Sequence, residues 1–221
     1  MTATEEDYML SISKQTLAKL PAAHYQGPIS VIDKPEDIDG AVKELYAAPI
    51  IGFDTETRPS FKKGQSNTVS LIQLCTPEHC FLFRTGITGI TQSLRALLED
   101  PAKTKVGLSL HDDFHNLAKI SDLQPDGFID LQHYVKSVRI ADNSLSRIYA
   151  IIFGKRIAKG QRLSNWEAAH LTEFQQSYAA LDAKACIDIY EAISQNRFRY
   201  EDSQYKAPID QLPEFQPSLQ Q

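Results

Sequence analysis

The sequence predicts an α/β fold in which a partly antiparallel sheet comes first along the chain and helices follow. Three apolar, β-rich runs follow one another with only turn-type residues between them, at 49–57, 68–76 and 79–85. From His111 onward the apolar residues recur at helical spacing instead. With 221 residues, 42% hydrophobic and 23% charged, the chain has the length and composition of one soluble globular domain.

The elements before the first of these runs mark where the domain begins. After the turn-forming residues Gly27 and Pro28, the segment 29–33 has the composition of a strand. An amphipathic helix is expected at 35–48, because Pro35 and two acidic residues occupy its first turn. The remaining expected elements are a helix at 90–100, a strand at 105–110, and helical segments at 113–120, 131–138, 144–154 and 172–195.

Both ends of the chain differ from this central region. Residues 1–27 are mostly polar and predict an arm laid on the domain, and residues 198–221 are rich in Pro and Gln and predict a tail that is either loosely ordered or docked. The expected organisation is therefore an arm at 1–27, one domain at 28–197 and a tail at 198–221. No internal repeat is found in the sequence.

Charge and cysteine content limit the class of protein. The net charge of -5 provides no global positive field for nucleic acid, which argues modestly against a pure binding module. The three cysteines form no CxxC pair, and Cys75 and Cys80 flank a turn that could bring them close; buried thiols in a reducing interior are the favoured interpretation. The N-terminus lacks a secretory pattern and no run has the length of a membrane span, so we expect a cytoplasmic protein.

Four separated carboxylates carry the functional prediction. On a strand, Asp54 and Glu56 of GFDTET are two residues apart and point to the same face, although a single DxE pattern is weak and strand-end acids are often only solvated. Together with Asp113 and Asp182, they form a set of four acids from three distant segments. Such a set can converge on a pair of hard divalent cations that stabilise both the attacking and the leaving oxygen of a phosphodiester, which points to a nuclease.

The second acidic segment contains adjacent aspartates. In KVGLSLHDDFHNL a strand becomes a helix, and Asp113 lies one helical turn before the anchoring Leu117, whereas Asp112 is better placed for helix capping. The spacing favours Asp113 as the ligand. His111 and His115 are left out of the site, because hard cations prefer oxygen ligands.

In the third segment Tyr178 and Asp182 are four residues apart in a helical pattern and share one helix face. A carboxylate that binds metal and a phenol that contacts the nucleophilic water could be presented together there. Taken alone, Tyr178 has the pattern of an amphipathic aromatic at the boundary of a core.

FDTET, KVGLSLHDD and YAALD resemble, in order and spacing, the three exonuclease motifs of the DEDD superfamily, and are most similar to its tyrosine-containing branch of RNase D and Werner-type exonucleases. The resemblance also includes VSLIQLC and LSNWEAAHLTEFQQSYAALDA and covers roughly residues 28 to 195. It implies an RNase H-like mixed five-stranded sheet flanked by helices. It also implies that the four acids hold two metal ions, Mg²⁺ or Mn²⁺, and that Tyr178 orients the attacking water.

Substrate contacts are less specific. Relatives often carry an arginine shortly after the tryptophan of SNW, where this chain has Ala169 and His170, so a phosphate contact is missing or supplied elsewhere. The segment GKRIAKGQR could hold phosphates, and a solvated charged loop is an equal alternative; its cations are Lys155, Arg156, Lys159 and Arg162. Trp166 and Phe61 are candidates for stacking on terminal bases, with packing as the alternative for the only tryptophan.

The predicted function is a metal-dependent 3'-5' exonuclease that releases nucleoside monophosphates from single-stranded 3' ends of DNA or RNA. No interaction with a membrane is expected. The alternatives are a non-catalytic nucleic-acid-binding module of the same fold and a phosphohydrolase of small nucleotides. The helicase or second binding domain appended in some members of the family is not found in this sequence, so we expect a partner protein to supply targeting.

Overall fold

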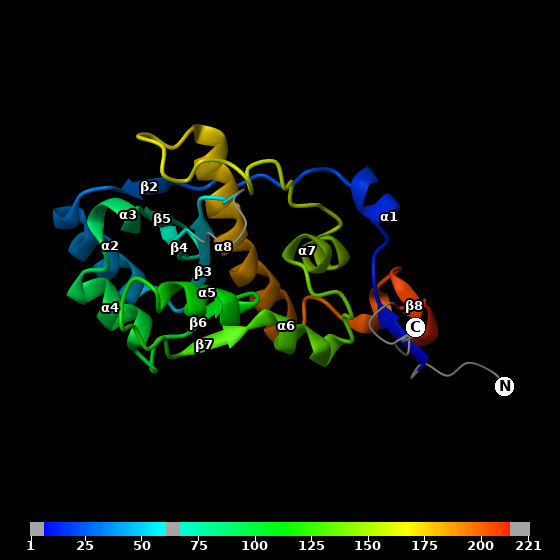
Figure 1. The fold of residues 1–221 in the computed structure, drawn as a ribbon. Helices are drawn as coiled ribbons and strands as arrows, with labels where there is room; N and C mark the ends of the chain where they lie inside the picture. The colour runs from blue at the N-terminus through cyan, green and yellow to red at the C-terminus, as the bar shows by residue number, and fades with distance from the viewer. Residues whose placement is uncertain (1–6, 61–66, 213–221) are drawn as a thin grey trace, which may run out of the picture.

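The computed structural model describes residues 7–60 and 67–212, and its main sheet has six strands in the order β2-β5-β4-β3-β6-β7 (Figure 1). β4 is antiparallel to both β3 and β5, whereas β2 and β5, β3 and β6, and β6 and β7 pair in parallel. The strands are β2 (Ile29–Ile32), β3 (Ile51–Thr57), β4 (Val69–Cys75), β5 (Cys80–Phe83), β6 (Lys105–Gly107) and β7 (Phe128–Asp130).

The mixed α/β architecture agrees with the prediction, but the sheet has one strand more than the expected five. The additional strand is β7, which is only three residues long and follows Gly127, whose φ of +70° makes the turn into the strand. Three residues are too few for an alternating pattern to be recognised in the sequence. β7 forms the edge of the sheet beside β6 and ends at Asp130, whose carboxylate accepts hydrogen bonds from the turn before α5.

Helix α8 (Glu173–Ser194) lies between one face of the sheet and α7 (Leu145–Phe153), as Figure 1 shows. It begins with a capping box, in which the Thr172 hydroxyl accepts from the Gln175 amide and the Gln175 side chain reaches back to Thr172. Gly52 on β3 lets the helix approach the strand closely, because a Cβ there would lie 2.1 Å from the Ala183 carbonyl oxygen. The close approach brings α8 directly over the acidic end of β3.

The other face of the sheet is covered by α2 (Pro35–Ala47) and α4 (Gln92–Glu99). Their buried side chains pack with Phe53 and Ile72 of the sheet in one apolar cluster, as their amphipathic spacing predicts. The other helices are α1 (Lys14–Lys19), α3 (Thr85–Thr88), α5 (Leu110–Leu117) and α6 (Leu131–Tyr134), with 3-10 helices at Val135–Val138, Tyr200–Asp202 and Ile209–Gln211.

The two ends of the described chain pair with each other. β1 (Tyr8–Leu10) and β8 (Lys206–Pro208) form a separate antiparallel ribbon, beyond α7 in Figure 1. The arm then runs along the start of residues 154–162, the basic loop: the Ala23 amide donates to the Arg156 carbonyl at 2.9 Å, and the Arg156 amide donates to the Pro21 carbonyl at 2.9 Å. The arm is thereby fixed beside residues expected to contact substrate.

The expectation of free thiols at Cys75 and Cys80 is wrong, because the structure joins them in a disulfide. The two residues are directly opposite each other in the β4–β5 hairpin, with Cα atoms 4.0 Å apart, so their side chains meet on one face of the sheet. Cys186 on α8 is a buried free thiol. Within 7–60 and 67–212, no helix combines the length and apolarity needed to cross a membrane.

Candidate active site

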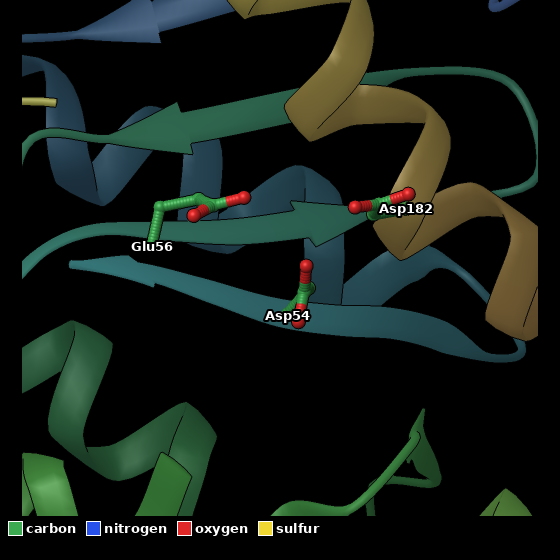
Figure 2. A group of neighbouring side chains, drawn as sticks. All are labelled: Asp54, Glu56 and Asp182. Carbon is green, nitrogen blue, oxygen red and sulfur yellow. The ribbon is translucent and has the colours of Figure 1, made fainter. Parts of the chain in front are cut away.

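Three carboxylates from two elements meet between the sheet and α8. Asp54 and Glu56 point from the same face of β3, and Asp182 faces them from α8, as Figure 2 shows. Each residue offers a carboxylate oxygen, and these oxygens all lie within 4.8 Å of one another. Glu56 and Asp182 are buried and Asp54 is half-buried. A shift in strand register directly after Glu56 ends the regular pairing with β4 at this point.

Asp113 on α5 lies near this group but is not one of the three residues whose oxygens lie within 4.8 Å of one another, and the Asp112 side chain points into solvent. The Thr55 hydroxyl donates a hydrogen bond to the Asp113 carboxylate, and the charge of Asp113 contributes to raising the pKa of Asp54. The Asp112 side chain is 86% exposed and lies beside His111, which is 95% exposed. Asp113 is therefore the member of the adjacent pair that interacts with β3, and its role as a ligand stays a prediction.

Asp130 holds the turn that presents Asp113. Its carboxylate accepts from the backbone amides of Ser109 and Leu110, both at 3.0 Å, and also caps α6 through the Gln132 amide at 2.8 Å. Ser109 has a φ of +62°, so this left-handed turn is stabilised by the carboxylate rather than by a glycine. Asp130 was not singled out in the sequence, where nothing distinguishes it from a surface acid.

Burial raises the pKa of all four carboxyl groups, and the charges of the other acids of the site raise the pKa of Asp54 and of Glu56 further. The pKa of Asp54 lies well above its usual range, first through burial and then through the charges of Asp182 and Asp113. Burial is also the main cause for Glu56, whose pKa is about 9, Asp182, about 7, and Asp113, about 6. Full ionisation of closely spaced carboxyl groups is unfavourable unless positive charge is added beside them.

The donor set fits a divalent metal ion. Hard cations such as Mg²⁺ and Mn²⁺ are bound by carboxylate oxygens, and this cluster supplies oxygens from three or four acids. Oδ1 of Asp182 is buried and has no hydrogen-bond partner among the described residues. An unpartnered buried carboxylate oxygen is costly, and a coordinated cation would satisfy it.

Tyr178 lies one helical turn before Asp182 and is half-buried. Burial, followed by the charges of Asp182 and Glu56, raises the pKa of its phenol above the ordinary value, so the hydroxyl stays protonated. Its ring is 6.2 Å from that of Trp166, which packs with Leu71 and Leu171 and is only 1% exposed. Trp166 therefore supports Tyr178 from within the core, and its stacking on substrate bases is a wrong expectation because the ring is covered.

The basic segment divides into two parts. Lys159 and Arg162 are exposed, and their positive charges lower the pKa of Asp182 and of Glu56 respectively, so both act on the acids electrostatically. Arg156 is half-buried and its Nε donates to the Leu20 carbonyl at 3.1 Å, which ties it to the arm instead. Lys155 is exposed, and nothing in the described structure links it to the acids. Phe61 lies outside the described residues.

Two buried polar residues, one opposite Asp54 and one beneath the segment 168–169, were not found from the sequence. Gln73 lies opposite Asp54 in the β3–β4 ladder and is fully buried, with no hydrogen-bond partner for either amide atom among the described residues. Arg84 is also buried, and its guanidinium donates to the carbonyls of Ala168 and Ala169, the latter at 2.7 Å. Arg84 thus anchors the segment in which the family arginine is missing, without being available to a phosphate.

The sequence matches the 3'-5' exonuclease family over residues 29–196, so the chain belongs to that family. It is 33% identical over 155 residues to the bifunctional 3'-5' exonuclease/ATP-dependent helicase WRN of Mus musculus, an alignment that covers 67% of this chain. The solved exonuclease domain of Aedes aegypti Nibbler aligns with a TM-score of 0.70 at 21% identity, over 82% of this chain and 97% of that chain. RNase D of Escherichia coli aligns with a TM-score of 0.65 at 25% identity, over 76% of this chain.

These comparisons confirm the resemblance to the DEDD superfamily that the three acidic motifs indicated, and they confirm the RNase H-like α/β fold. The matched region accounts for 11% of the length of the mouse protein and 44% of the E. coli RNase D chain. What is shared is thus the exonuclease domain, and not the whole of these larger proteins.

Proposed function

We propose that this chain is a metal-dependent 3'-5' exonuclease that hydrolyses the terminal phosphodiester of single-stranded DNA or RNA and releases nucleoside monophosphates. The observation that carries the proposal is the grouping of Asp54, Glu56 and Asp182, with oxygens within 4.8 Å, beside Asp113. Membership in the 3'-5' exonuclease family supports the direction of cleavage. Targeting by a partner protein and a cytoplasmic location stay predictions.

The four acids would hold two divalent ions, magnesium or manganese. When bound, such ions activate a water molecule for attack and stabilise the leaving oxygen. Asp54 is central, because the charges of Asp182, Asp113 and Glu56 all act on it. Asp113 is oriented for this task by the Thr55 hydroxyl, and the α5 turn that carries it is held by Asp130.

Tyr178 would orient the attacking water through its hydroxyl. The raised pKa keeps the phenol protonated, so it acts as a neutral hydrogen-bonding group and not as a base. The position of its ring is set by Trp166 in the core and by its place one turn before Asp182. Lys159 and Arg162, whose charges act on the acids, would bind the phosphates of the substrate strand.

The proposal is tested with 5'-labelled single-stranded DNA and RNA of one sequence, incubated with Mg²⁺ or Mn²⁺. The wild type, Asp54→Asn and Asp112→Asn are compared after purification by one protocol. A ladder that shortens from the 3' end with the wild type and Asp112→Asn, and that chelator or Asp54→Asn abolishes, is the expected result. Turnover of dinucleotides alone would indicate a small-nucleotide hydrolase, and binding without cleavage would indicate a binding module; either would overturn the proposal.

A further inference from the structure

A pocket of about 170 Å³ lies directly beside Tyr178, on the side of α8 that faces the arm and the basic loop. One wall is a single helix face, Phe174, Ser177, Tyr178 and Leu181, at the spacing of residues that share a face. The opposite wall includes His24 of the arm and Gln161 of the loop. Tyr178 thus belongs both to this pocket and to the acidic site.

Phe174 is the unusual member of this pocket. Its side chain is 77% exposed in the first turn of α8, the largest exposure among the bulky apolar residues of the described ranges. An exposed phenylalanine contributes little to folding, and it leaves an aromatic face open at the rim of a pocket. The next such residue, Leu163 at 67%, lies in the same basic loop as Lys159 and Arg162.

Hydrogen bonds hold the backbone on two sides of the pocket. His24 follows Ala23, whose amide donates to the Arg156 carbonyl at 2.9 Å, and the Arg156 Nε donates to the Leu20 carbonyl, so the arm is anchored just before His24. The backbone of Phe174 lies within the capping box formed by Thr172 and Gln175 at the start of α8. The slot therefore lies between two segments whose backbones are anchored by hydrogen bonds.

Size and surroundings indicate what fits. Pockets for drug-sized ligands have roughly 300–1,000 Å³, so this slot suits a single flat ring. An aromatic face, with an imidazole and an amide side chain opposite, matches the stacking and edge groups of a nucleobase. The cations of the neighbouring loop, Lys159 and Arg162, match the phosphates that a nucleobase in a strand brings with it.

We propose that this slot binds a nucleobase of the substrate strand next to the cleaved bond, with Phe174 as the stacking platform. The inference rests on the proposed function, because it places the base beside the acidic site through Tyr178, which belongs to both. It adds a contact that the sequence did not predict: base stacking is provided by Phe174 and not by Trp166.

The test compares steady-state cleavage by the wild type, Phe174→Ala, Phe174→Trp and Ile87→Ala on the same oligonucleotide. Ile87 is an exposed apolar residue of α3 and does not line the slot, so it serves as the matched control. Loss of a stacked base is worth about 1–3 kcal/mol, so Phe174→Ala should raise KM about 5- to 150-fold with little change in kcat. Phe174→Trp should retain the wild-type KM, and Ile87→Ala should leave it unchanged.

A second set of substrates locates the base. Each carries one abasic site, moved a nucleotide at a time from the 3' end. At one position within the last few nucleotides, removing the base should raise KM for the wild type but not for Phe174→Ala, because the same contact is removed twice. Additive effects at every position, or an unchanged KM in Phe174→Ala, would overturn the proposal.

The inference and the proposed function fail in different ways. If the wild type cleaves while Phe174 and the abasic sites act independently, only the stacking platform is wrong. If the wild type binds but does not cleave, the same comparison of wild type and Phe174→Ala on intact and abasic strands is made with the Kd of a fluorescent oligonucleotide. Non-additivity at one position would then support the slot although catalysis failed, and a protein that neither cleaves nor binds would contradict both.

Discussion

Gln73 lies directly opposite Asp54 in the β3–β4 ladder, and both of its amide atoms are buried without a hydrogen-bond partner in the described structure. Opposite residues of a ladder point to the same face, so the amide lies in the layer between the sheet and α8, beside the acids. An unsatisfied buried amide is unfavourable for folding by about 1–3 kcal/mol. Its position beside Asp54 suggests that the amide supports the metal ligands once metal ions are bound.

Replacing this amide should therefore separate stability from activity. In chelator, Gln73→Met should raise Tm by about 2–4 °C, which corresponds to roughly 1 kcal/mol in a chain of this size. Cleavage should fall about 10- to 100-fold, the usual effect of losing a group that supports metal ligands. Melting curves and initial rates measure the two effects, and the exposed Gln124→Met should change neither. A lower Tm for Gln73→Met in chelator would contradict this account.

Asp113 and Asp112 provide a neighbouring pair that differs in position but not in chemistry. Asp113→Asn should reduce cleavage by more than the roughly 10- to 100-fold that loss of an outer contact costs, because the carboxylate itself is removed. Asp112→Asn should keep most of the activity, since that side chain is 86% exposed. Initial rates at saturating metal distinguish the two. The reverse order of activities would show that α5 presents the other aspartate.

The raised carboxyl pKa values predict how the metal-free protein responds to pH. Unfolded carboxyl groups titrate near pH 4, whereas Asp113, Asp182 and Glu56 titrate at about 6, 7 and 9 when folded. The folded state therefore binds more protons between these limits, and its stability falls as pH rises from about 4 to about 9. Below this window the groups are protonated in both states and carry no penalty.

Asp182→Asn isolates one contribution to this dependence. In chelator, the variant should gain Tm relative to the wild type as pH rises from 5 through about 7, where Asp182 ionises, and the difference should level off above that. Added Mn²⁺ should raise the Tm of the wild type and not that of the variant. A Tm difference that is constant across the pH range would show that Asp182 titrates normally.

Gly52 tests the contact that brings α8 to β3. A Cβ at this position would lie 2.1 Å from the Ala183 carbonyl oxygen, so Gly52→Ala must push the helix that carries Asp182 and Tyr178 away from the strand. Overpacking of this kind costs about 1–3 kcal/mol, and cleavage should be lost with it. Gly40→Ala in α2 is the control, because a Cβ added there would have no neighbour within 4 Å, and it should stabilise by about 0.5–1 kcal/mol. Equal melting temperatures for the two variants would refute the close approach.

Much of the fold could be predicted because its signals are local. The apolar runs of β3, β4 and β5 and the capping residues of α8 are visible in the sequence, and the matching elements are found. β7 and the β1–β8 ribbon were missed because they are three-residue strands held by pairing with distant segments, which no local pattern reports. The disulfide depends on the β4–β5 register, which places Cys75 opposite Cys80.

The same difference between local and long-range signals decides which residues of the site could be predicted. The acids and Tyr178 were predicted because their spacing forms motifs, and the structure brings three of them, Asp54, Glu56 and Asp182, together. Burial cannot be read from residue type, so Trp166 and Arg156 were assigned to substrate although one is packed and the other holds the arm. Gln73 and Asp130 depend on their neighbours in space, and a sequence does not show those.

The central claim, that four carboxylates form a metal centre, is tested most directly by calorimetric titration of the metal-free protein with Mn²⁺ at pH 8. The wild type and Asp112→Asn should bind with the same affinity and stoichiometry, whereas Asp54→Asn, which alters the carboxylate on which the other three act, should lose most of the binding. Equal binding by the wild type and Asp54→Asn, with both folded, would contradict the account.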